Sequence, residues 1–137
     1  GEVAPATNPP KLPLRLHLGD ARVDEIVVRR GENDYLFILV PAGRRFDWQK
    51  LRAHLGVRRL SLPDAAEAHA ATGYERGAIT PFGSSTAWPV ILDEAAMARP
   101  LVAIGGGAHG VNLHLPPADL AAALAAAVVD VSIPEPA

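Results

Sequence analysis

The chain has 137 residues, of which 49% are hydrophobic, a formal net charge of −2 and no cysteine. These totals fit one domain with a genuine core, and they exclude disulfides, a thiolate nucleophile and a cysteine-based metal site. No apolar run approaches the ~18–20 residues of a transmembrane helix, and the N-terminus lacks the basic and apolar regions of a signal peptide. We therefore expect a cytoplasmic protein with no membrane partner, although a chain without cysteine is also compatible with secretion.

The negative net charge argues against a dedicated nucleic-acid binder, but the charge is unevenly distributed. Residues 22–59 hold nine Arg or Lys and five Asp or Glu, whereas the rest of the chain holds four and ten. This pattern is either ordinary variation on a solvated surface or a basic face for a polyanion such as a tRNA backbone. In the second case the expected phosphate contacts are Arg29, Arg30, Arg44, Arg45, Arg58 and Arg59.

A proline-rich lead-in over residues 1–17 precedes the expected domain, residues 18–133, and a tail over 134–137 follows it. Two β-rich runs, 23–30 and 35–40, flank the polar turn Gly-Glu-Asn-Asp, which predicts a hairpin. The second run is almost continuously apolar, so we expect a central strand that is buried on both faces.

Helices and short strands then alternate. Asp47 and Gly56 are suitable first and last caps for a helix over residues 46–56, and Ser61 followed by Asp64 resembles the start of another. The predicted elements after the hairpin are helices over 46–56, 61–73 and 116–128, a helical link over 93–99, and strands over 57–62, 88–93, 100–107, 110–115 and 128–133. Because some links are hairpins, the fold class is α/β (α+β), a single domain with a mixed sheet of about six to seven strands and flanking helices.

The connection over residues 72–90, "TGYERGAITPFGSSTAWPV", is rich in Gly and Pro and carries three aromatic residues. Glycine lets the backbone approach a ligand closely, and proline lowers the entropy cost of ordering a loop. Such a loop can present backbone N–H groups to the oxyanion that develops during ester hydrolysis. A long connection without chemistry has the same composition.

A second Gly-rich stretch, "IGGGAHGVNLHL", lacks the pattern of a phosphate-binding loop, so a nucleotide site is not expected. His109 and His114 would fall on opposite faces of a continuous strand and do not form a metal pair. Spacing identifies no His–Asp partner for the serines near residue 85. We therefore expect neither a metal nor another cofactor.

Several segments together carry a family resemblance: "DYLFILVPAGRRFDWQKLRAHLGVRRLSL", "TGYERGAITPFG", "PVILDE" and "GGGAHGVNLHLPPADL". They resemble the YbaK/EbsC family of aminoacyl-tRNA deacylases, which includes free-standing Pro-tRNA editing proteins and the editing insertion of bacterial prolyl-tRNA synthetases. The resemblance covers about residues 18–131, and its most specific part is Gly-Tyr-x-x-Gly-x-x-x-Pro-Phe-Gly. It implies a curled, YbaK-like sheet and a substrate loop from Gly77 to Pro81 whose backbone amides lie beside the aminoacyl ester.

The resemblance also implies site residues. Catalysis would involve the backbone of Gly77 and the side chain of Asn112, which otherwise is a polar strand residue facing solvent. Substrate binding would involve Gly73, Tyr74, Ala78, Ile79, Pro81, Phe82, Gly83, Gly105, Gly106, Gly107, His109 and Asp24. His109 is alternatively a histidine of a surface loop.

The sequence departs from the family at the start of the first core strand, where many members carry a lysine. Asp24 stands there, or Glu25 if the register shifts by one residue. Three functions remain open. The chain deacylates a mischarged tRNA, with tRNA-Pro as the expected substrate and a synthetase as a further partner. It is a non-catalytic member that binds an aminoacyl-like ligand or a protein. It acts on another small substrate, with Asp24 or Glu25 recognising an amine or serving as a base.

Overall fold

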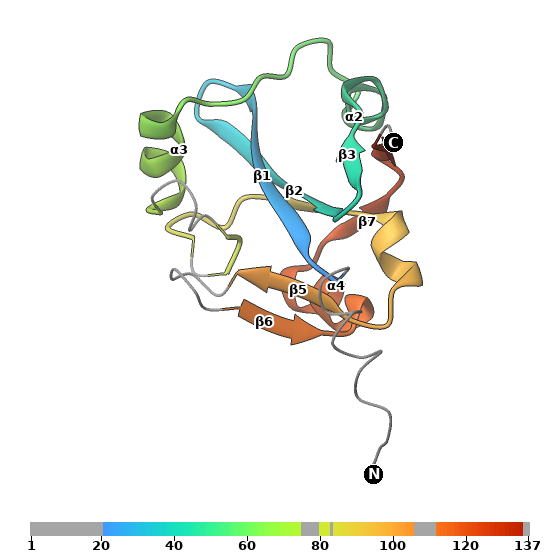
Figure 1. Cartoon of the computed structure of the whole chain (residues 1–137). Helices are drawn as coiled ribbons and strands as arrows, with labels where there is room; N and C mark the ends of the chain where they lie inside the picture. The colour runs from blue at the N-terminus through green and yellow to red at the C-terminus, as the bar shows by residue number, and fades with distance from the viewer. Residues whose placement is uncertain (1–20, 75–79, 83, 106–111, 136–137) are drawn as a thin grey trace, which may run out of the picture.

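A computed structural model of the chain describes residues 21–74, 80–82, 84–105 and 112–135 (Figure 1). The elements in chain order are β1 (Val23–Gly31), β2 (Asp34–Pro41), β3 (Arg44–Phe46), α2 (Trp48–Leu55), α3 (Ala65–Thr72), β4 (Val90–Asp93), the 3₁₀ helix η1 (Glu94–Ala98), β5 (Val102–Gly105), β6 (Asn112–Leu115), α4 (Pro117–Leu124), β7 (Ala127–Val129) and β8 (Ser132–Pro134). The predicted fold class, one mixed α/β domain with flanking helices, is confirmed.

The main sheet is mixed and has the strand order β1-β2-β4-β7. β1 and β2 form the predicted antiparallel hairpin, whereas β4 runs parallel to both β2 and β7. The other strands of the described residues form two antiparallel pairs, β3–β8 and β5–β6, rather than extending one continuous sheet. Immediately before β1, an isolated bridge pairs Arg22 with Ala103 of β5, so the β5–β6 pair lies beside the start of β1.

Strand β2 is central and buried on both faces, as its apolar run predicts. Phe37 and Leu39 pack into one core with β1, β4, β5 and α4, whereas Leu36, Ile38 and Val40 pack into a second core with α2. Figure 1 shows the β5–β6 pair on one side of the main sheet and α2 with the β3–β8 pair on the other. Both faces are therefore covered, which is typical of sheets with parallel strands.

The helices α2 and α3 begin and end at clear caps. Asp47 accepts a hydrogen bond from the Gln49 N–H, and Gly56 ends α2 in the left-handed region at φ 69°. The predicted start of the next helix at Ser61 is wrong. Asp64 is the residue that caps α3, and its side chain accepts from the Glu67 N–H at 2.8 Å. Ser61 instead pairs through its backbone with β1.

The largest differences in extent concern three other predicted elements. The expected strand over 57–62 is reduced to one bridge, because only Ser61 exchanges backbone hydrogen bonds with Arg29. The expected helix over 116–128 ends at Leu124, since Ala125 adopts φ 50°. The expected last strand over 128–133 is two strands, β7 and β8, which belong to different sheets.

Candidate functional site

Glu25 lies on the face of β1 that also carries the core residues Val23 and Val27, because side chains of a strand alternate. Its carboxylate meets the end of β5, where the Gly105 N–H donates to Glu25 Oε2 at 3.0 Å. A Cβ atom at Gly105 would stand 3.1 Å from Glu25 Oε1. The glycine therefore permits the close approach of β5 to the carboxylate.

Thr80 joins this contact from the Gly/Pro-rich connection. It is fully buried, and its hydroxyl donates to the Gly105 carbonyl at 2.8 Å. The junction formed by Glu25, Thr80 and Gly105 thus brings together β1, the connection and the end of β5. These are the two Gly-containing stretches and the strand start from which the sequence predicts a site.

Burial raises the pKa of Glu25 to about 7, because a charged carboxylate is poorly solvated there. Hydrogen bonding to the Thr80 side chain and to the Gly105 backbone acts in the opposite direction, and the negative charge of Asp24 adds a smaller upward effect. The carboxyl group of Glu25 is therefore half-protonated near neutral pH. A cation bound beside it would favour the charged carboxylate.

A pocket of about 480 Å³ opens beside Glu25, between β1 and the start of α3. Its walls are mostly apolar or small and are formed by Ile26, Val27, Leu62, Pro63, Ala65 and Ala68. Among the residues that line it, the two ionisable side chains are Glu25 and Asp64, both acidic. This acidic pocket suits a ligand that combines a positively charged amine with an apolar group.

The connection around Thr80 is fixed to the rest of the fold by its aromatic residues. The Tyr74 hydroxyl donates to the Phe82 carbonyl at 2.6 Å, and the Trp88 Nε1–H donates to the Ala71 carbonyl at 2.8 Å. The Trp88 ring also packs edge-on against Tyr35, with centroids 5.2 Å apart. The aromatic residues thus hold both ends of the connection against α3 and the main sheet.

The predicted site residues separate into groups. Gly73 ends α3 at φ 80°, and Tyr74, Pro81 and Phe82 are half-buried near Thr80. The backbone of Asn112 pairs with Gly105 between β5 and β6. Gly77, Ala78, Ile79, Gly83, Gly106, Gly107 and His109 lie outside the described residues.

Asp24 and Glu25 have different surroundings. The side chain of Asp24 is 38% exposed and pairs with Arg22 at 2.6 Å, whereas Glu25 faces the junction. The sequence pattern does not mark Thr80 as a site residue, and its one signal is a polar side chain between Ile79 and Pro81.

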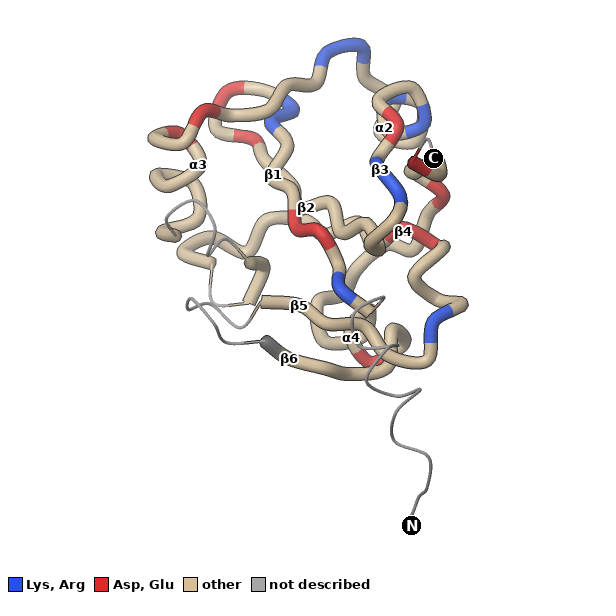
Figure 2. The backbone as a smooth tube through the Cα atoms, in the orientation of Figure 1, with Lys and Arg blue, Asp and Glu red and all other residues tan. Residues whose placement is uncertain are grey.

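A second pocket, of about 430 Å³, lies further along β1 and is lined by arginines. Of the six arginines predicted to contact phosphates, Arg29, Arg30, Arg58 and Arg59 line this arginine pocket, together with Arg52. Arg44 is engaged elsewhere with Ser132, and Arg45 lies exposed on β3. Figure 2 shows acidic residues near the start of β1 and basic residues towards its hairpin end, where the turn itself also carries acidic residues.

Within the described ranges, no helix has the length and apolar character needed to cross a membrane. The same residues contain no group of three or more His, Cys, Asp or Glu side chains that could hold a metal ion.

Solved structures with this fold include one that is named as a tRNA-editing protein. A candidate trans-editing enzyme for prolyl tRNA synthetase is 28% identical with a TM-score of 0.76, and the match covers 83% of this chain and 71% of that one. A structure from work on the computational grafting of linear epitopes onto scaffold proteins is 29% identical, also with a TM-score of 0.76, over 83% of this chain and 75% of that one.

The profile of the aminoacyl-tRNA editing domain matches residues 17–123, and the chain belongs to this family. The resemblance drawn from the sequence is thereby confirmed. A curated relative from Enterococcus faecalis, EbsC, is named as a candidate Cys-tRNA(Pro)/Cys-tRNA(Cys) deacylase and is 27% identical over 79 residues. The match covers 58% of this chain and 48% of the relative, so the chain spans about half of that relative's length.

Proposed function

We propose that this protein is a trans-acting hydrolase that removes the amino acid from a mischarged tRNA, with tRNA-Pro as the expected substrate. The observation that carries the proposal is the acidic pocket beside Glu25, in a chain of the aminoacyl-tRNA editing family. An aminoacyl ester combines an α-amine, which is largely protonated below its pKa of roughly 8, with a side chain that is often apolar. Both features match the lining of this pocket.

In the proposed reaction, backbone amides between Gly77 and Pro81 polarise the ester carbonyl, as the family resemblance implies. Water attacks the carbonyl carbon, and the bond from that carbon to the ribose oxygen breaks. The ribose oxygen takes up a proton, and the products are the free amino acid and the tRNA. Pre-positioned amides favour this reaction because they stabilise the oxyanion without reorganisation. Asn112 is the candidate side-chain donor at the same site.

Glu25 is proposed to bind the α-ammonium group of the substrate. It occupies the region where many relatives carry a lysine, and it is held in place by Gly105. A carboxylate at this point attracts a cation that a lysine would repel. Binding of the ammonium would also keep Glu25 charged despite its burial, because an opposite charge nearby favours the ionised form.

Deacylation of a panel of mischarged tRNAs, including tRNA-Pro species, tests the function. We expect faster release of one or a few amino acids than in buffer alone, with correctly charged tRNAs spared. Absence of release from every member of the panel would contradict the proposal.

The replacement of the expected lysine by a carboxylate also favours one alternative, a non-catalytic member that binds an aminoacyl-like ligand. This alternative predicts that amino-acid amides raise the melting temperature of the protein while no substrate is turned over. A synthetase that generates the mischarged tRNA is the expected protein partner of the deacylase, and the cytoplasm is the expected compartment.

A further inference from the structure

The edge of β1 that does not pair with β2 is divided by one contact. Arg29 and Ser61 exchange both backbone hydrogen bonds, at 2.8 and 3.1 Å, in an antiparallel bridge. On one side of the bridge, residues 25–27 and 62–68 contribute to the acidic pocket. On the other side, residues 29–31 and 58–61 contribute to the arginine pocket. The two pockets therefore follow one another along the same strand edge.

The arginine pocket carries a surplus of positive charge. Two of its five arginines are neutralised by carboxylates: Arg29 lies 3.1 Å from Glu67, and Arg30 makes two hydrogen bonds to Asp34, at 2.9 and 3.1 Å. The other three, Arg52, Arg58 and Arg59, have no ion pair with any carboxylate of the described residues.

Arg52 is the arginine of this pocket whose unpaired donor is most clearly defined. Its guanidinium lies 5.7 Å from the centre of the Trp48 ring, which offsets only part of its charge. Its Nε atom is buried and has no hydrogen-bond partner among the described residues. An unpaired donor of this kind is costly in a folded protein, and an anion bound nearby would reduce the cost.

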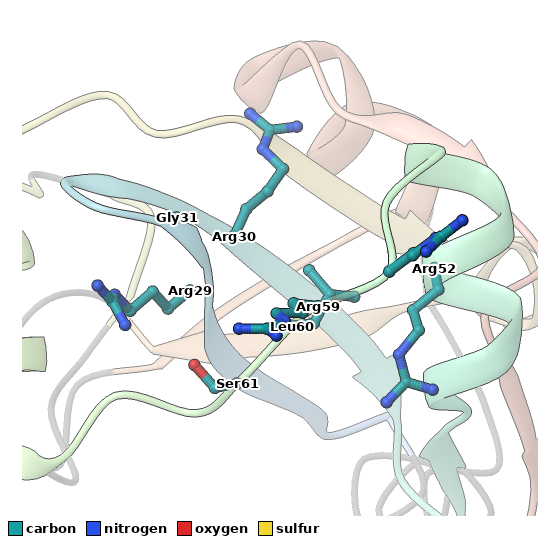
Figure 3. A pocket seen from close by; sticks show the side chains of 8 residues that line it. Arg29, Arg30, Gly31, Arg52, Arg59, Leu60 and Ser61 are labelled. Atoms are coloured by element: carbon teal, nitrogen blue, oxygen red, sulfur yellow. The ribbon is translucent and has the colours of Figure 1, made fainter.

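The arrangement of the arginines fits a chain of phosphates better than a single phosphate. Figure 3 shows the side chains of Arg52 and Arg59, two of the arginines without an ion pair to a described carboxylate, pointing in different directions. Guanidinium groups that bind one phosphate would converge on it. A polyanion can instead meet several separated cations, each at its own phosphate.

We propose that the arginine pocket binds backbone phosphates near the acceptor end of an RNA whose aminoacyl group occupies the acidic pocket. This inference rests on the proposed function, since it assigns the two pockets to two parts of one substrate. The four residues from Glu25 to Arg29 correspond to about 13 Å along a strand. β1 thus orients the substrate, with the positively charged aminoacyl end near Glu25 and the negatively charged backbone beyond the Arg29–Ser61 bridge.

The test uses an uncharged RNA hairpin that reproduces the acceptor stem and ends in single-stranded CCA, so that binding is measured apart from hydrolysis. The double variant Arg58→Gln/Arg59→Gln removes two unpaired charges, and Arg45→Gln is the matched control on β3. Two lost phosphate contacts reduce the salt slope by roughly 1.4–1.8. Between 50 and 200 mM salt, wild-type affinity should therefore fall about 7- to 12-fold more than that of the double variant.

Arg45→Gln should bind the hairpin like the wild type. Equal salt slopes for the double variant and the wild type, or no binding of the hairpin by the wild type, would overturn the inference. So would competition by inorganic phosphate at concentrations equal to those of the RNA phosphates. The panel of mischarged tRNAs tests the deacylase function independently of this binding experiment, because it measures release of the amino acid.

Discussion

The substitution Glu25→Gln tests the electrostatics of the junction directly. Glutamine keeps an oxygen that can accept from the Gly105 N–H, but it cannot ionise. The pKa of Glu25 is about 7 in the folded protein, against an ordinary value of 4.5. Between these values the folded state binds more protons than the unfolded state, so the wild type must lose stability as the pH rises from about 4.5 to 7.

The size of this loss follows from the two pKa values. Their difference corresponds to at most about 3 kcal/mol, and because Glu25 is only half-buried, solvent screening reduces this to roughly 1–2 kcal/mol. The glutamine variant lacks this contribution. Relative to the wild type, the Glu25→Gln protein should therefore gain roughly 1–2 kcal/mol in unfolding free energy between pH 4.5 and pH 8.

Urea unfolding of both proteins at pH 4.5 and pH 8 measures the effect, and Glu32→Gln in the exposed hairpin turn is the matched control. Glu32→Gln should follow the pH dependence of the wild type. If the difference between Glu25→Gln and the wild type stays constant across this range, Glu25 is not a buried carboxyl with a raised pKa, and the electrostatic description of the junction is wrong.

The same variant also tests the proposed role of Glu25 towards the substrate. A hydrogen bond to a charged group contributes about 1.5–3 kcal/mol, so loss of the ammonium contact should lower kcat/KM for deacylation about 10- to 100-fold at pH 8. The loss should appear mainly in KM and should shrink near pH 5.5, where Glu25 of the wild type is largely neutral. An equal loss at both pH values would argue against an ionised Glu25 as the binding group.

Three further predictions concern the loop, the metal and the core. Gly77→Ala should remain folded but lose about 10²–10³ in deacylation rate, because a methyl group would enter the proposed amide cradle; wild-type turnover by the folded variant would contradict that mechanism. Deacylation should be unchanged after treatment with a chelator, and loss of activity that a divalent ion restores would require a metal-dependent mechanism. Asp93→Ala should lower the unfolding free energy by about 3–5 kcal/mol in urea titrations, because it removes the buried partner of Arg44, 3.9 Å away. Asp93 also accepts from the Val131 N–H and the Ser132 hydroxyl, so Asp93→Asn should retain part of that stability.

The sequence predicted the local elements with strong caps and continuous apolar runs. The β1–β2 hairpin, the burial of β2 and the ends of α2 at Asp47 and Gly56 all followed from residue type and spacing. The prediction of a strand over 57–62 was wrong. The apolar residues there indicate a strand, but in the folded chain this segment makes a single bridge to β1.

The choice between Asp24 and Glu25 could not be made from the sequence. Alternation identifies the inner face of a strand when one face is polar, but β1 contributes Val27 to one core and Val28 to the other. The junction also depends on Thr80, whose contact with Gly105 joins residues 25 positions apart. A contact of this kind is set by the packing of β5 against β1, which spacing along the chain does not specify.

The single bridge between Arg29 and Ser61 has a consequence for how such a protein can diverge. Residues 58–63 contribute to both pockets, so under the proposed function an insertion there would alter RNA binding and amino-acid preference together. Ala65 and Ala68 on α3 line only the acidic pocket. Under the proposed function, a larger side chain at either position would narrow the range of amino acids removed and leave the arginines undisturbed. Under that function, Ala65 and Ala68 are two positions at which the amino-acid preference could change while the phosphate contacts stay the same.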